Sequence, residues 1–178
     1  MLFPLKFRPK ESYHERPRKF GAPRSNGTRK HAGCDLYAPV GTPVFAVADG
    51  TIISIYEFYL STWAIEVDHG DFIVRYGEVR KNMPVGIRAG AKIQAGRLIG
   101  EVGLLSGLKV SMVHFEMYDG TATGPLTQRG NKPYQRRKDL IDPTSYLDAA
   151  QLPGLVMSPC FALPGMKPGT FGFTAGML

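Results

Sequence analysis

The side chains best suited to bind a metal ion lie in two short motifs of this 178-residue chain. His31 and Asp35 are four residues apart, and a later stretch with the pattern of a strand contains His114. Alternation along that strand places Met112, His114 and Glu116 on one face. Two imidazole nitrogens and one carboxylate oxygen would make a three-ligand zinc site whose fourth position is open to water. Taken singly, neither motif is specific, because an HxxxD spacing is common by chance and a strand histidine is more often structural.

The elements that must position these residues are strands. Short runs of β-branched and aromatic residues, bounded by glycine and proline, dominate the middle of the chain. Asp49-Gly50 predicts a two-residue hairpin between two of these runs, and a second turn is expected at 69–71. Asp142-Pro143 predicts the start of one short helix. Since no stretch keeps a helical period for more than a turn or two, the fold class is all-β or nearly so. Strands are expected at 44–48, 51–56, 63–68, 72–76 and 110–118.

Charge and composition divide the chain into three parts. The formal net charge of +7 lies entirely within residues 1–30, and the rest of the chain is neutral. We expect a basic, irregular N-terminal arm over residues 1–28 and a β domain over 29–151. Residues 152–178 carry one charge, Lys167, among many prolines and glycines, so we expect an apolar tail that docks on the domain or on a partner.

The basic arm is compatible with several partners. A phosphate-rich molecule, an anionic cell-wall polymer or a membrane surface would each suit it, and so would a purely solvated role. A second basic group within 129–138 lacks the interleaved aromatic residues of a single-strand binding groove. Nucleic acid is therefore a disfavoured partner.

The sequence shows no membrane or secretory signal. No stretch approaches the ~18 consecutive apolar residues of a transmembrane helix, and charges interrupt the N-terminus too early for a signal peptide. The two cysteines, Cys34 and Cys160, have no CxxC spacing, so free thiols are favoured over one long-range disulfide.

A series of short motifs in a fixed order resembles a known family. The stretches 31–36, 38–44 and 46–50 read HAGCDL, APVGTPV and AVADG, and they are followed by VDHG at 67–70, VRYG at 74–77, IQAGRLIG at 93–100 and VHFE at 113–116. In this order they resemble the lysostaphin-type zinc peptidoglycan endopeptidases over residues 29–120. The resemblance implies an antiparallel β half-barrel or sandwich with a groove that holds one zinc ion. It also implies that His31, Asp35 and His114 are the metal ligands.

Two positions depart from the family pattern. The family has a histidine after its middle strand, where this chain has Glu78, and a histidine at the start of its closing H-x-H, where this chain has Met112. Methionine can neither donate a proton nor accept one as a base. Glu78 could act as the general base, or it could become a fourth ligand and close the site. The sequence does not show whether Glu78 faces the metal, since a one-residue register shift would turn it away.

Three neighbouring residues have weaker prospects of a role. His69 lies in a turn next to Asp68 and is interpreted as structural, and Cys34 is interpreted as packing. Glu116 could support His114 as a carboxylate outside the ligand set, although same-face neighbours on a strand seldom bond directly.

Two hypotheses follow for function. The first is a zinc metallo-endopeptidase that cuts peptide bonds in the stems or cross-links of bacterial peptidoglycan, with Glu78 in the catalytic role. The second is a catalytically silent relative that binds peptidoglycan or a partner protein. In either case we expect action in the periplasm or at the cell wall after non-classical delivery. A phage-associated protein or a secreted effector would fit, with residues 152–178 docking on the secretion or tail-assembly partner.

Overall fold

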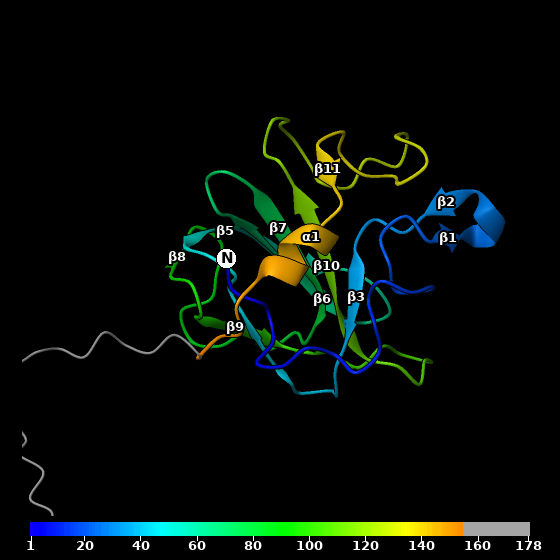
Figure 1. Cartoon of the computed structure of the whole chain (residues 1–178). Helices are drawn as coiled ribbons and strands as arrows, with labels where there is room; N and C mark the ends of the chain where they lie inside the picture. Colours follow the sequence, from blue (N-terminus) through cyan, green and yellow to red (C-terminus); the bar gives the residue numbers. More distant parts are fainter. Residues whose placement is uncertain (155–178) are drawn as a thin grey trace, which may run out of the picture.

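The computed structural model describes residues 1–154 and is nearly all antiparallel β, as the sequence predicts (Figure 1). None of the helices in this range is long and apolar enough to cross a bilayer. The elements, in chain order, are β1 (Pro23–Arg24), a single 3₁₀ turn η1 (Ser25–Gly27), β2 (Arg29–Lys30), β3 (Cys34–Tyr37), β4 (Pro43–Phe45), β5 (Gly50–Glu57), β6 (Trp63–Asp68), β7 (Ile73–Val79), β8 (Lys92–Ile93), β9 (Leu98–Glu101), β10 (Met112–Tyr118), β11 (Leu140–Ile141) and α1 (Thr144–Ala149).

One seven-stranded sheet organises the domain. Its strands lie in the order β11-β10-β7-β6-β5-β8, and β3 also pairs with β10. The turn at 69–71 joins β6 to β7 as predicted, with Asp68 opposite Ile73. Alternation on β10 also holds: Val113, Phe115 and Met117 lie in the apolar core, whereas Met112 and His114 face the opposite side. The sheet therefore has one face in the core and one face that carries polar chemistry.

The predicted hairpin at Asp49-Gly50 is wrong. β4 pairs with β9 rather than with β5, and β5 pairs with β6 and β8. The Asp49 carboxylate accepts a hydrogen bond from the Ala95 amide at 2.8 Å, so it ties this corner to a distant loop. A Cβ on Gly50 would lie 2.5 Å from the carbonyl oxygen of Asp68, so the glycine allows two strands to approach closely.

The segment before β1 contains no helix and no strand, yet it is part of the core. Phe3 and Leu5 are fully buried, and Tyr13 is nearly so. The Arg8 guanidinium donates to the carbonyl oxygens of Leu147 and Ala150, which fastens the segment to α1 and the residue after it. The basic N-terminal segment is therefore irregular and packs against the domain. The tail expected at 152–178 lies mostly outside the described residues.

Candidate metal centre

Three potential metal ligands converge from two paired strands. Asp35 on β3 lies directly opposite His114 on β10, and His31 enters from the link between β2 and β3. The Asp35 Oδ1 atom is 3.0 Å from His31 Nε2 and 2.8 Å from His114 Nδ1. The two imidazole nitrogens are 3.1 Å apart. The structure therefore brings His31, Asp35 and His114 together as a compact, buried group.

The outer nitrogens of both rings are already hydrogen-bonded. His31 Nδ1 lies 2.9 Å from the Lys19 carbonyl oxygen, and His114 Nε2 lies 2.9 Å from Glu116 Oε1. Both partners can only accept, so each ring donates its proton outward when it is neutral. The inner nitrogens then direct lone pairs at each other and at the Asp35 carboxylate. Three acceptors that face one another require a cation, either a proton or a metal ion.

The donor set fits zinc. Ligand atoms around a tetrahedral ion at 2.0–2.2 Å are separated by roughly 3.3 Å, and the three atoms here are separated by 2.8, 3.0 and 3.1 Å. A small outward movement of the three side chains would make room for the ion. Two histidines and one carboxylate are also the type of ligand set that leaves a position open for chemistry.

Without a metal, a proton has to serve as that cation. Burial disfavours a charged His114 ring, but its hydrogen bonds to Asp35 and Glu116 outweigh this effect and raise its pKa to about 9. Burial also lowers the pKa of His31. The shared proton therefore belongs on His114.

A buried charge network fixes the orientation of His114. Glu116 is fully buried and accepts from Arg75 at 2.7 Å and from Arg136 at 2.8 Å. Burial alone would raise the pKa of Glu116, but Arg75 and the hydrogen bond from His114 hold it well below its usual range. The carboxylate therefore stays ionised and keeps the His114 Nε2 proton directed away from the site. His114 and Glu116 thus form a direct hydrogen bond, although neighbours on one face of a strand seldom do so.

A β-bulge directs Glu78 into the groove. Tyr76 pairs with Ile65 and Val79 pairs with Trp63, so Gly77 and Glu78 together lie opposite the single residue between them on β6. Glu78 has φ +66°, which is uncommon for a residue with a side chain. Simple alternation would have placed it on the core face with Tyr76. The extra residue instead turns it to the face that carries His114.

Gly77 makes room for this arrangement. A Cβ at this position would lie 2.8 Å from the Phe58 ring and 3.3 Å from His114 Cβ. The Phe58 ring stacks on the His114 ring with centroids 6.0 Å apart. Phe58 is thus a groove residue that the sequence did not reveal, and no local motif marks it.

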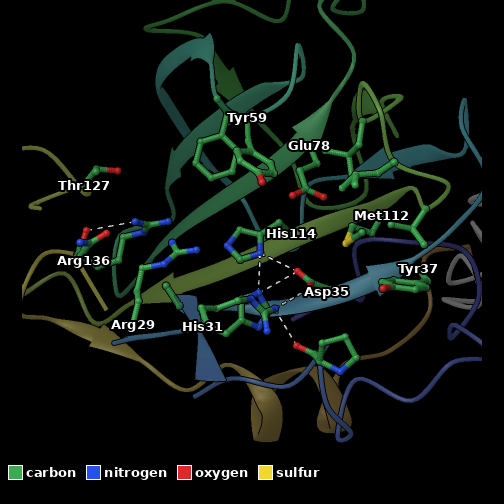
Figure 2. A pocket seen from close by; sticks show the side chains of 18 of the residues that line it. Arg29, His31, Asp35, Tyr37, Tyr59, Glu78, Met112, His114, Thr127 and Arg136 are labelled. Carbon is green, nitrogen blue, oxygen red and sulfur yellow. Dashed lines mark hydrogen bonds and ion pairs between the residues drawn. The ribbon is translucent and has the colours of Figure 1, made fainter. Parts of the chain in front are cut away.

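The Glu78 carboxylate is buried in the groove. The residue is 7% exposed, and among the residues that the structure describes its Oε2 atom has no hydrogen-bond partner. Burial raises its pKa to about 7. Figure 2 shows the carboxylate directed into the same hollow as His114 and Asp35. Both features suit a group that exchanges a proton near neutral pH.

The hollow is a groove of about 720 Å³. Figure 2 shows Met112 and Tyr37 on one side of the His31–Asp35–His114 group and Arg29 and Arg136 on the other. Met112 is buried and lines the groove with a thioether, which cannot donate a hydrogen bond.

The remaining sequence candidates lie elsewhere. His69 Nδ1 contacts the Asp49 carbonyl oxygen at 2.9 Å, and its Nε2 contacts the Tyr76 hydroxyl at 3.2 Å, which supports a structural role. Cys34 lies in the core, where burial raises the pKa of its thiol to about 11. It is therefore packing, as predicted, and Cys160 lies outside the described residues.

Comparison with known families decides the relationship. The model of "Peptidase family M23" matches residues 29–125, which include His31, Asp35, Glu78 and His114. The chain belongs to peptidase family M23. A curated relative, the peptidoglycan DD-endopeptidase ShyC of Vibrio cholerae, is 27% identical over 126 residues, which are 70% of this chain and 28% of ShyC. The chain thus spans just over a quarter of the length of that relative.

Solved structures share the M23 fold. The catalytic domain of lysostaphin from Staphylococcus simulans has a TM-score of 0.55 at 20% identity, over 73% of this chain and 89% of that domain. A variant of the catalytic domain of the prophage-encoded M23 protein EnpA from Enterococcus faecalis has a TM-score of 0.52 at 22% identity, over 79% and 91% of the two chains. These likenesses confirm the lysostaphin-type β fold predicted from the sequence.

Proposed function

We propose that this chain is a zinc-dependent endopeptidase that hydrolyses peptide bonds in the stems or cross-links of peptidoglycan. Membership of family M23 and the relationship to a peptidoglycan DD-endopeptidase support the substrate class. The observation that carries the proposal is local. A buried carboxylate oxygen of Glu78, which has no hydrogen-bond partner in the described part of the chain, faces the groove in which His31, Asp35 and His114 converge.

In this proposal His31 Nε2, Asp35 Oδ1 and His114 Nδ1 hold one zinc ion. When bound, the ion supplies Lewis-acid chemistry, which polarises a peptide carbonyl and makes a water molecule more acidic. Glu78 Oε2 takes the proton of the attacking water and then passes it to the leaving amine. A carboxyl with a pKa of about 7 suits both steps, because it can accept and return a proton near neutral pH.

Other residues hold this machinery in place. Glu116 fixes the ring orientation of His114, and Arg75 and Arg136 hold Glu116. Because these groups are buried, they add little mobility to the site. The bulge at Gly77 and Glu78 fixes the position of the Glu78 carboxylate relative to the three ligands.

The second candidate is a silent relative that binds peptidoglycan or a partner without cutting. Met112 favours it, because the groove wall lacks a donor there for a developing oxyanion. In that case Glu78 would be a fourth ligand and would close a structural zinc site.

Digestion of purified sacculi separates the two candidates. The zinc-loaded protein would be incubated with sacculi, and the released fragments would be identified by mass spectrometry. A His114→Ala variant removes a ligand, and His14→Ala is a matched control because His14 lies on the surface. Fragments that end at one defined peptide bond and disappear only with His114→Ala support the endopeptidase. Intact sacculi in the presence of folded, zinc-bound protein would overturn it.

The proposed substrate also implies where the protein acts. Peptidoglycan lies outside the cytoplasmic membrane, so we propose that the chain works in the periplasm or at the cell wall. Cell fractionation that finds it only in the cytoplasm would contradict this placement.

A further inference from the structure

The groove has a cationic end. Arg24 and Arg29 enter it from the β1–β2 hairpin, and Arg129 and Arg136 enter from the long connection between β10 and β11. Figure 2 shows Arg29 and Arg136 together on one side of His114, opposite Met112 and Tyr37.

The two segments that carry these arginines are fastened to each other. The Lys30 amide donates to the Pro133 carbonyl oxygen at 3.0 Å, and the Phe20 ring stacks on Tyr134 with centroids 4.9 Å apart. The two segments therefore hold the cationic end in a fixed place in the folded groove.

Two of the four guanidinium groups pair with a carboxylate within the site. Arg24 pairs with Asp35 at 3.3 Å, and Arg136 pairs with Glu116 at 2.8 Å. Within residues 1–154, neither Arg29 nor Arg129 has an ion pair or a side-chain hydrogen bond. Arg129 is exposed, but Arg29 is partly buried in the groove.

Arg29 is thus a partly buried cation that no other described residue pairs with. The guanidinium groups of Arg24 and Arg136 line the same groove. Arginine keeps its charge under all ordinary conditions, so this arrangement costs free energy in the empty groove. A bound anion would recover that cost and could form two parallel hydrogen bonds with the planar fork.

We propose that Arg29 is a specificity residue that binds a free carboxylate of the peptide substrate, close to the bond that is cut. Arg129 adds positive charge at the outer edge of this carboxylate subsite. The proposal rests on the proposed endopeptidase function and deepens it, because it selects substrates by charge. The opposite wall is less polar, with Met112 and the ring of Tyr37. A substrate would therefore lie in one direction, with its carboxylate toward Arg29 and an apolar side chain toward Met112.

The test uses two peptidoglycan-derived peptides that differ only in one group near the scissile bond, a free carboxylate in one and a carboxamide in the other. We would measure kcat/KM for both with the wild type and with Arg29→Gln, Arg29→Lys and Arg88→Gln. Arg88 is an exposed arginine outside the groove and serves as the matched control. In the described range 1–154 the side chain of Arg29 makes no hydrogen bond or ion pair, so its replacement is expected to leave the fold intact.

The wild type is expected to prefer the carboxylate peptide by about tenfold or more, the size of one charge-assisted hydrogen bond. Arg29→Gln should remove this preference by slowing only the carboxylate peptide. Arg29→Lys should restore part of it, and Arg88→Gln should leave it unchanged. Equal cleavage of both peptides by the wild type would overturn the inference, and so would an equal loss for both peptides with Arg29→Gln.

Binding to the metal-free protein separates this inference from the proposed function. If the wild type cuts neither peptide, calorimetry with the same two peptides still decides the role of Arg29. Tighter binding of the carboxylate form, lost in Arg29→Gln, would support the subsite although the enzyme proposal had failed. Glycerol phosphate is the competing anion. Binding of glycerol phosphate to Arg29 without any preference between the two peptides would assign the subsite to a phosphate and overturn the carboxylate proposal.

Discussion

Replacement of Glu78 by Gln is expected to stabilise the metal-free protein, and to do so more strongly as the pH rises. Burial favours the neutral form of this carboxyl and raises its pKa from 4.5 to about 7. The neutral group therefore contributes stability that is fully present below the unfolded pKa. That stability is lost as the pH rises through the folded pKa, because the fold must then hold a buried negative charge. Glutamine has nearly the same shape and cannot ionise.

The size of the effect follows from the shift. Each pKa unit corresponds to about 1.4 kcal/mol, so a shift from 4.5 to about 7 costs wild-type protein about 3 kcal/mol at pH 8. At pH 5 the unfolded carboxyl is only partly protonated, and the cost is about 1 kcal/mol. The free energy of unfolding of Glu78→Gln should therefore exceed that of the wild type by about 2 kcal/mol more at pH 8 than at pH 5.

Urea unfolding with a chelator present, followed at several pH values, measures this difference. Glu57→Gln is the matched control, because Glu57 is an exposed glutamate at the end of β5. A stability difference for Glu78→Gln that stays constant between pH 5 and pH 8 would refute the reasoning. It would mean that Glu78 is ionised in a solvated site and is not held in the buried groove.

Three further predictions address other parts of the molecule. Glu116→Gln should weaken zinc binding by about 10–100-fold, measured by competition with a chelating dye, because His114 loses the carboxylate that orients it; an unchanged affinity would contradict this role. Phe3→Ala should lower the free energy of unfolding by about 3–5 kcal/mol in urea titrations, because the ring is fully buried. A loss below about 0.5 kcal/mol would mean that the N-terminal segment does not contribute to the core. Met112→His should raise kcat on a defined peptide by about tenfold or more, since it adds a hydrogen-bond donor on the same face of the sheet as His114. A fall in kcat would show that the groove requires the thioether.

Most of the sheet could be predicted because its signals are local. The turn at 69–71 and the strands on either side of it depend on neighbouring residues, and the structure has them at β6 and β7. The Asp49-Gly50 signal failed because the partner of β4 is distant in sequence. Turn residues can serve a close approach of strands as well as a hairpin, and Gly50 does so. Composition also hid the role of residues 1–28, since their many charges obscured the buried Phe3 and Leu5.

The candidate site divides in the same way. Alternation placed His114 and Met112 on one face, and the family resemblance supplied the pairing with His31 and Asp35. The orientation of Glu78 was beyond the sequence, because a bulge adds one residue and reverses the alternation. The lack of an ion-pair partner for Arg29 among residues 1–154 could not be predicted either, since it depends on which acidic groups the other arginines contact.

The central claim is that Glu78 is the base of a zinc-dependent peptidase. Its most direct test is kcat/KM of Glu78→Gln on a defined cross-linked peptide, with the zinc content measured on the same samples. We predict one zinc ion per chain in both proteins and a fall of about 10²–10⁴-fold in kcat/KM for the variant. Unchanged turnover would contradict the claim. Loss of the zinc ion in the variant would contradict it as well, because Glu78 would then be a ligand.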